Sequence, residues 1–265
     1  MVRQLAARAN RGPMPLFATT AVHATIRAMA QRINKDLSIF DTPAYSASEV
    51  ARILNLPPAT VKAWCFGQSY RSTSGERKHF QPVIEAASPK SRLLSFVNLC
   101  ELHVLSAIRR HHKIALPKVR ESVEFVRSRL GASRPLVDRE FKTNGIDLFV
   151  EHATQLLNVS RQGQEALRGE FELALARIER DRAGSPIRLF PFSRTSTPGS
   201  AQPRAIVIDP HLSFGRPVLS KAAIPTDIIV GRFRAGDSLT EMAKDYGVDE
   251  KEIEEALRFE QRRAA

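Results

Sequence analysis

The stretch from Tyr45 to Phe80 constrains the fold of this chain more than any other, because it predicts two short helices separated by a tight break. Ser46 or Ser48 can cap the first helix, since a serine hydroxyl accepts hydrogen bonds from the free amides of an opening turn. Asn-Leu-Pro-Pro at positions 55–58 ends this helix and begins the next, because proline fits only the first turn of a helix. The pattern is typical of a helix-turn-helix.

The second helix and the loop after it carry residues that favour DNA binding. Val61, Trp64 and Cys65 are spaced for an inner face, which leaves small and basic side chains outside, and such a helix can enter a major groove. The loop adds aromatic and cationic side chains suited to phosphates, as a wing would. An ordinary helical hairpin with a solvated basic loop is the alternative. The residues predicted to bind DNA are Thr60, Lys62, Ala63, Arg71, Arg77 and Lys78.

The net charge of +12 over 265 residues favours a polyanionic partner, most simply nucleic acid. Membrane surfaces and acidic proteins also attract basic chains, so charge alone does not select a class. Cys65 and Cys100 lie inside apolar helical patterns, which indicates buried thiols in a reducing cytosol and a cytoplasmic protein. No apolar run approaches membrane-spanning length, so no membrane partner is expected.

Residues 1–44 are predicted to form a basic N-terminal arm. Positions 1–35 contain arginines and no acidic residue, a composition that a transit peptide shares. A misassigned start codon is a further alternative.

Two helices are predicted after the wing. The helix from Ser91 to His112 is apolar on nearly every face, and Pro117 begins the next one. Because such a helix is hard to bury within one small domain, we expect a homodimer formed through it or through the helix that begins at Pro117.

The middle of the chain predicts small β elements. Asn144-Gly145 within Phe141–Val150 indicates a tight hairpin, and Leu156–Val159 a further short strand. A helix near Glu165 runs on through Ile178 to Gly184, and Ile187–Phe192 is a strand. Ser193–Arg204 is rich in Ser, Thr and Pro, which predicts a linker.

The final segment repeats the pattern of the first helix pair without gaps, with residues 241–256 matching 49–64. Thr226–Ala235 precedes them, so three short helices are predicted. Two capping-box patterns support the second pair, Ser238 with Glu241 and Asp249 with Glu252. Its last helix is acidic where the first pair is basic, so phosphates would repel it. A protein partner with a basic surface fits this face, and a solvated helix face is the alternative.

These patterns predict a mainly α protein with small β elements, of the α+β class. The expected parts are a basic arm (1–44), a winged helix-turn-helix and helical domain (45–135), a β-hairpin and helix connector (136–192), a linker (193–204) and a C-terminal three-helix domain (205–265).

The first helix pair resembles the MerR-like helix-turn-helix, in which Ser-x-x-Glu-Val-Ala opens the first helix and a wing follows the second. Ser46, Glu49, Val50 and Ala51 carry this resemblance. Ala63-Trp64-Cys65 stands where that family has an Arg-Tyr-Tyr run, so its sequence preference does not carry over.

Ile206–Phe259 resembles a family long labelled a domain of unknown function and now regarded as antitoxins of PIN-like ribonuclease toxins. The motifs that carry the resemblance are Ile208-Asp209-Pro210, Phe214-Gly215-Arg216-Pro217-Val218, Ile224-Pro225-Thr226, Arg232-Phe233, Gly236-Asp237-Ser238 and Ala243-Lys244-Asp245-Tyr246. With the front domain, the chain resembles a large VapB-type antitoxin. The resemblance implies a type II toxin-antitoxin operon, repression of its own promoter as a dimer on operator DNA, and a larger hetero-oligomer with the toxin.

PIN-like nucleases hold metal with clustered carboxylates and surround them with cations that grip RNA. Arg216 is therefore the candidate to meet the toxin carboxylates, because its planar fork pairs with them. Glu250, Glu254 and Glu255 are the candidates to meet the cations. The alternative for Arg216 is that it ties a turn to its own domain.

Two further classes compete with the antitoxin. One is a stand-alone MerR-like regulator whose C-terminal part senses a small ligand, and the other is a nucleic-acid-processing enzyme that uses Asp209 and His211. A turn at Asp209-Pro210-His211 and a solvated basic helix end at His111-His112 are the favoured interpretations of these residues. No catalytic triad order, phosphate loop or zinc spacing stands out, so no enzyme activity, cofactor or metal is expected.

Overall fold

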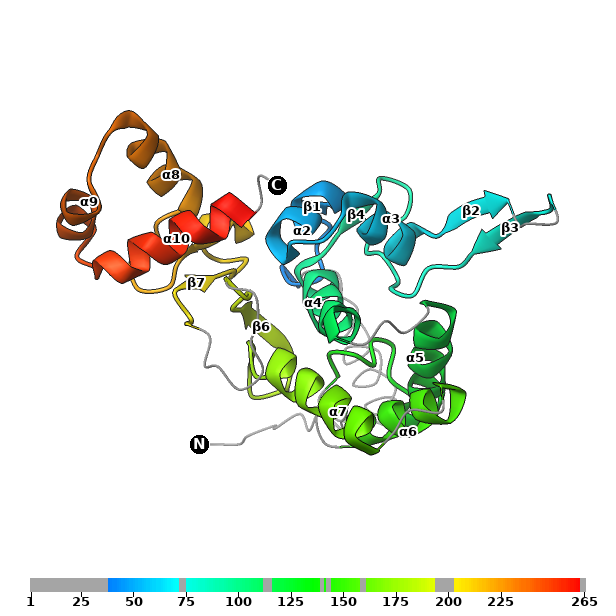
Figure 1. Cartoon of the computed structure of the whole chain (residues 1–265). Helices are drawn as coiled ribbons and strands as arrows, with labels where there is room; N and C mark the ends of the chain where they lie inside the picture. The colour runs from blue at the N-terminus through cyan, green and yellow to red at the C-terminus, as the bar shows by residue number, and fades with distance from the viewer. Residues whose placement is uncertain are drawn as a thin grey trace, which may run out of the picture. The chain divides into compact units, whose positions relative to one another are not determined.

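The structure, a computed structural model, describes residues 38–71, 75–111, 116–138, 141, 144–157, 161–193 and 203–262. Residues Ile39–Ala265 form one compact unit, and the predicted arm lies outside the described residues up to position 37. Helices with short antiparallel strand pairs make up this unit, which confirms the predicted α+β class (Figure 1).

The predicted helix-turn-helix consists of α2 (Ala47–Leu54) and α3 (Pro58–Phe66), preceded by β1 (Tyr45–Ser46). Of the two candidate serines, Ser46 caps α2. Its Oγ accepts from the Glu49 amide at 3.2 Å, and the Glu49 carboxylate accepts from the Ser46 amide at 2.7 Å. This reciprocal cap explains why so short a helix begins at a defined residue.

The predicted wing is also present. β2 (Gln68–Arg71) and β3 (Arg77–Phe80) pair antiparallel and extend away from α3 (Figure 1). β4 (Leu93–Leu94) then returns to pair with β1, which ties the chain after the wing to the residues before α2.

Helix α4 (Phe96–His111) is the centre of the larger core. Every side chain from Phe96 to Ala107 is at most 6% exposed, and the helix packs against α2, α7 and β6 of the same chain. It begins later than predicted, because Leu93 and Leu94 belong to β4. The expectation that a second copy is needed to bury this helix was wrong, since segments distant in sequence cover it.

Helices α5 (Leu116–Leu130), α6 (Gly145–Leu157) and α7 (Arg161–Leu175) follow, each packed on the next. The other candidate for a dimer contact, the helix that Pro117 begins, therefore has its apolar face on α6.

The hairpin predicted at Phe141–Val150 was wrong. Asn144-Gly145 instead begins α6, whose first turn is closed by the Leu148 amide donating to the Asn144 carbonyl at 3.1 Å. Gly145 is required for packing rather than for a hairpin turn, because a Cβ there would lie 2.5 Å from the Phe141 ring. The strand predicted at Leu156–Val159 was also wrong where the chain is described, since α6 runs to Leu157.

The central hairpin lies further along, where β5 (Ile178–Arg180) pairs with β6 (Pro186–Leu189). The helix predicted through Ile178 ends at Leu175, and β6 covers part of the strand predicted at Ile187–Phe192.

The C-terminal part opens with β7 (Ile206–Val207) and β8 (Val218–Leu219), paired across the short 3-10 turn η2 (Ser213–Gly215). The three predicted helices follow as α8 (Thr226–Ala235), α9 (Leu239–Tyr246) and α10 (Glu250–Arg262), around a second apolar cluster that includes Ile229, Met242, Ile253 and Phe259.

The two helix pairs match residue for residue at an offset of 192 positions. Ser46 and Ser238 cap α2 and α9 in the same reciprocal way, each with a glutamate three residues on. Asn55 and Gly247 end these helices in the left-handed conformation, with φ of 53° and 64°. In the second predicted capping box, the Asp249 amide donates to Glu252 at 3.3 Å. The repeated pattern in the sequence therefore corresponds to a repeated local structure.

The segments before and after the predicted linker contact each other. Residues 194–202 of this linker lie outside the described part. Ser193 Oγ donates to the buried Glu255 carboxylate of α10 at 2.6 Å. Leu189 and Ile208 exchange backbone hydrogen bonds at 3.0 and 2.8 Å. The domain boundaries at this linker stay a prediction.

Candidate functional site

Helix α3 presents its predicted inner face to the core. Val61, Trp64 and Cys65 are at most 3% exposed, and burial raises the pKa of the Cys65 thiol well above its usual value, so this thiol stays protonated. The Trp64 carbonyl accepts from the amides of Val83 and Ile84 at 2.7 and 3.0 Å. The end of α3 is therefore held by the chain that returns from the wing.

The outer face of α3 carries the residues predicted to read bases. Lys62 is exposed, and Thr60 and Ala63 are half-buried. Of the three, only Lys62 stands clear of the core, since Ala63 is packed against its edge and Thr60 lies one turn before the buried Trp64. Their role in sequence preference stays a prediction.

The wing places two of its predicted phosphate contacts face to face. Arg71 pairs with Arg77 in the β2–β3 register, and both side chains are exposed. Like charges directly opposite each other on a ladder are destabilising, and a bound anion would relieve the repulsion. The side chain of Lys78 lies outside the described part of the structure.

The base of the wing is fixed by contacts that sequence reasoning missed. Gly67 joins α3 to β2 with φ of +72°, and a Cβ there would lie 2.5 Å from the Phe80 carbonyl oxygen. Arg120 of α5 lies over the Phe80 ring at 5.2 Å and donates to the Gln81 carbonyl at 3.3 Å. No local pattern marks Arg120, because it reaches the wing from a separate helix.

Two more cations lie beside the end of α3. The Arg92 guanidinium is stacked 4.7 Å above the Phe66 ring, and Lys90 lines the same surface hollow. The basic turn Pro-Lys-Ser-Arg at 89–92 is the signal in the sequence that could have identified them.

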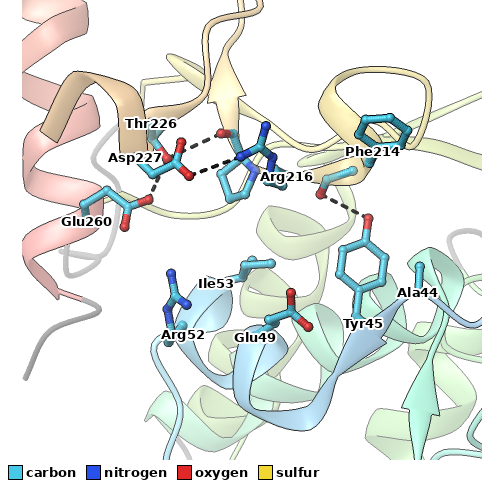
Figure 2. A pocket seen from close by; sticks show the side chains of 12 residues that line it. Ala44, Tyr45, Glu49, Arg52, Ile53, Phe214, Arg216, Thr226, Asp227 and Glu260 are labelled. Carbon is cyan, nitrogen blue, oxygen red and sulfur yellow. Dashed lines mark hydrogen bonds and ion pairs between the residues drawn. The ribbon is translucent and has the colours of Figure 1, made fainter. Parts of the chain in front are cut away.

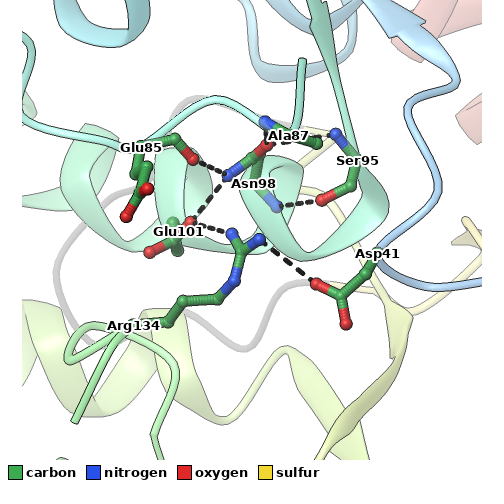
Figure 3. A network of polar contacts seen from close by, with 7 residues as sticks. All are labelled: Asp41, Glu85, Ala87, Ser95, Asn98, Glu101 and Arg134. Carbon is green, nitrogen blue, oxygen red and sulfur yellow. Dashed lines mark hydrogen bonds and ion pairs between the residues drawn. The ribbon is translucent and has the colours of Figure 1, made fainter. Parts of the chain in front are cut away.

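A buried polar network fastens α4 to the segments around it (Figure 3). Asn98 donates to the Glu101 carboxylate at 2.9 Å and to the Glu85 carbonyl at 2.8 Å. Arg134 bridges Glu101 at 3.0 Å and Asp41 at 3.2 Å. Burial raises the pKa of Glu101, while Arg134 and Asn98 act in the opposite direction. The network positions the chain on both sides of the helix-turn-helix.

Arg216 lies at a hollow of about 190 Å³ that α2 and the C-terminal part share (Figure 2). Its side chain is 54% exposed, pairs with Asp227 at 3.3 Å and donates to the Ser213 carbonyl at 3.3 Å. These contacts tie the turn to its own domain, yet leave half of the side chain open. Glu49 and Arg52 of α2 line the same hollow.

One hydrogen bond joins the two sides of this hollow directly. Tyr45 Oη donates to the Gly215 carbonyl at 3.1 Å, and burial raises the pKa of this phenol well above its usual value. Gly215 has φ of +76°, and a Cβ there would lie 2.0 Å from the Tyr45 hydroxyl. Glycine is thus required both for the turn and for the close approach.

The acidic candidates on α10 differ in exposure. Glu250 and Glu254 are exposed, and Glu250 accepts from Thr240 at 2.7 Å. Glu255 is only 3% exposed, and its carboxylate is held by Ser193 and Arg258. The surface role predicted for Glu255 does not fit this placement, because the carboxylate holds the chain together internally.

Asp209 and His211 form the favoured turn. One Asp209 oxygen accepts from the His211 amide at 2.9 Å, and the other pairs with Arg188 at 2.8 Å. Burial alone would raise the pKa of Asp209, but Arg188 and His211 hold it below its usual value. Within the described residues, no group of three or more His, Cys, Asp or Glu side chains could hold a metal ion. The side chains of His111 and His112 lie outside the described part.

Two family models each match one part of this chain. Residues 43–123 match one described as "Putative DNA-binding HTH domain", and residues 206–259 match one described as "Protein of unknown function (DUF433)". The chain therefore combines a helix-turn-helix domain with a C-terminal domain of the kind predicted from its motifs. In the part of the chain that the structure describes, no helix is long and apolar enough to cross a membrane.

Particular relatives come from Mycobacterium tuberculosis. A protein named "Putative antitoxin VapB45" is 28% identical over 82% of this chain and 94% of its own length, and "Uncharacterized protein Rv2308" is 23% identical over 84% and 92%. The crystal structure of Rv2018 from the same organism shares the fold, with a TM-score of 0.59, 24% identity, and coverage of 83% of this chain and 100% of that one. The predicted resemblance to a large VapB-type antitoxin is confirmed.

Proposed function

We propose that this chain is a DNA-binding antitoxin of a type II toxin-antitoxin system. In this proposal it represses its own operon and neutralises a PIN-like ribonuclease by direct binding. The observation that carries the proposal is that one chain holds two helix pairs of the same local structure and opposite surface charge. One pair suits DNA and the other suits a basic protein surface, and a relative named as an antitoxin matches over most of its length.

Operator binding would use α3 and the wing, on a dimer that reads an inverted repeat. Exposed Lys62, Arg71 and Arg77 support this assignment. Changing Arg77 to Ala should weaken binding to all sequences and lower the slope of log affinity against log salt by about one. Changing Lys62 to Ala should also alter the preference between promoter and random DNA.

Fluorescence anisotropy over a series of salt concentrations, with promoter and scrambled duplexes, measures both effects. Lys244→Ala is the matched control, because this exposed cation lies on α9. Absence of salt-dependent promoter binding by the unaltered chain would contradict the DNA-binding role.

Toxin neutralisation is tested by co-expression with the protein encoded by the adjacent gene. A stable complex that lacks nuclease activity is the expected result. Arg216→Ala should weaken the complex if its exposed fork reaches the nuclease carboxylates. A neighbouring product that does not co-purify with the chain would contradict the antitoxin role, while leaving the DNA-binding role intact.

A further inference from the structure

An open hollow of about 530 Å³ lies between α8 and α10, with Arg52 of α2 at its edge. We call it the α8–α10 groove. Val230, Phe233 and Leu257 supply its apolar lining, and Phe233 is 45% exposed. Water covers exposed apolar surface at a cost in free energy, so the exposed Phe233 ring beside the partly buried Val230 indicates an interaction site.

The basic and the acidic side chains around the groove differ in the contacts that they already make. Arg52 and Arg234 are exposed, and neither belongs to an ion pair within the described residues. At the rim, Asp227 pairs with Arg216, and the Glu260 carboxylate accepts from the neutral Thr226 hydroxyl at 2.5 Å. The groove therefore offers two available cations beside an apolar lining.

Gly231 gives the groove an open stretch of helix backbone. It lies in the middle of α8, lines the groove, and would meet nothing within 4 Å if it carried a Cβ. Its backbone is helical, so no unusual conformation calls for glycine. A glycine inside a helix costs about 1 kcal/mol relative to alanine. Among the described residues nothing fills the space above Gly231, so a partner segment could lie against the helix backbone there.

We propose that the α8–α10 groove binds the protein partner through an apolar segment of that partner flanked by carboxylates. This inference rests on the proposed antitoxin function and adds where the partner sits and what chemistry it presents. The partner apolar side chains would cover Phe233 and lie over Gly231, and its carboxylates would pair with Arg52 and Arg234. Burial at the centre of the contact would strengthen these pairs, because they would be shielded from water.

Other occupants fit the groove less well. A DNA duplex presents no apolar segment to the lining. The chain's own residues 1–35 contain arginine and lysine but no acid, so Arg52 and Arg234 would repel them. The exposed face of α10 on a second copy is acidic, yet the apolar residues of that helix, such as Ile253 and Phe259, are buried in its own core.

The test compares two glycine substitutions in the full chain. Gly231→Gln places a side chain over the groove, and Gly169→Gln places the same side chain on α7, where a Cβ also meets nothing within 4 Å. Glutamine is a good helix former, so both variants should fold. The probe is the protein encoded by the adjacent gene, titrated by calorimetry. Gly231→Gln should weaken binding by about tenfold or more, and Gly169→Gln by less than about twofold.

A charge-reversal pair completes the experiment. Arg52→Glu with Arg234→Glu should weaken the complex and reduce its dependence on salt, whereas Arg161→Glu, at the exposed start of α7, should do neither. If the groove variants bind the partner as tightly as the unaltered chain, the groove assignment is wrong while the antitoxin function stands. If the unaltered chain forms no complex, both fail. If Gly231→Gln instead dissociates a homodimer in light scattering, the occupant is a second copy and the inference is overturned.

Discussion

Arg134 is the residue that makes a buried carboxylate in α4 tolerable. Glu101 is 3% exposed, and its hydrogen bonds to Asn98 and Arg134 replace those that water would provide. Taking a carboxylate out of water is costly unless a cation and hydrogen bonds compensate it. Breaking such a pair therefore affects stability more than breaking a pair on the surface.

Changing Arg134 to Met should lower the free energy of unfolding by about 3–5 kcal/mol at neutral pH. Arg168→Met is the control, because its ion pair with Asp147 at 2.6 Å is about half exposed on both sides. We expect this surface variant to lose about 0–1 kcal/mol. Urea unfolding measures both values, and equal losses would contradict the role assigned to Arg134.

The contribution of Glu101 to stability changes with pH in one direction. Because burial raises the pKa of Glu101, the native state binds this proton more tightly than the unfolded chain. The resulting stability is fully present below the ordinary carboxyl pKa and is lost as pH rises through the folded-state value. Loss of the Arg134 cation should raise that pKa further, so Arg134→Met should lose more stability than the unaltered chain does as pH rises above the ordinary carboxyl pKa. Adding Glu101→Gln should remove the extra dependence.

At the scale of elements, the wing depends on one glycine at its base. Gly67 has φ of +72° and ψ of 175°, a region that essentially only glycine occupies, and its missing Cβ leaves room for the Phe80 carbonyl. Gly75 at the wing tip also has positive φ, at +82°, but a Cβ there would meet nothing within 4 Å. The two glycines thus share the backbone requirement and differ in the contact.

Gly67→Ala should therefore destabilise the chain more than Gly75→Ala. We expect about 1–3 kcal/mol from the backbone strain at Gly67, with the contact against Phe80 in addition. Gly67→Ala should also weaken DNA binding, because the wing would shift relative to α3. Urea unfolding and anisotropy with promoter DNA report the two effects. Equal behaviour of the two variants would show that the contact at Phe80 has no consequence.

The elements that sequence patterns predicted well are those defined locally. Ser46 with Glu49 and Ser238 with Glu241 are capping signals complete within four residues, and both helices begin where these signals stand. Sequence patterns predicted the wrong element where contacts between distant segments determine the local structure. Asn144-Gly145 is a hairpin signal, but packing of Gly145 beneath Phe141 makes it a helix start.

In the candidate site, too, features set by local spacing were predicted, and features set by contacts between distant segments were not. The inward face of α3 follows from its spacing, whereas Arg120 reaches the wing from α5, and the buried Glu255 is held by Ser193, the first residue of the predicted linker. No local pattern reports these contacts, because each joins segments far apart in the chain.

At the scale of the whole molecule, residues Ile39–Ala265 form one unit. The contacts from Tyr45 to Gly215 and from Ser193 to Glu255 link the helix-turn-helix and the middle of the chain to the C-terminal part. A predicted domain boundary at the linker would instead let the two parts unfold separately. Trp64, the single tryptophan, reports the state of the helix-turn-helix by its fluorescence.

Changing Met242 to Ala tests whether residues Ile39–Ala265 unfold as one unit or the C-terminal part unfolds separately. Met242 is fully buried in the C-terminal apolar cluster, so the substitution should cost about 2–5 kcal/mol there. If the unit unfolds cooperatively, the Trp64 fluorescence transition should move to lower urea together with the circular dichroism signal. A Trp64 transition that stays in place while helicity is lost early would mean that the C-terminal part unfolds alone.

The hydrogen bond from Tyr45 to Gly215 also sets an order of events on the ribosome. The two residues are 170 positions apart, so the partner of Tyr45 does not exist when the helix-turn-helix leaves the exit tunnel. At about 5–20 residues per second, the wait is roughly ten to thirty seconds. During that interval α2 and α3 lack one of the contacts that fasten them. A nascent chain therefore completes the contacts of its helix-turn-helix only after Gly215 has been made, shortly before the acidic helix α10.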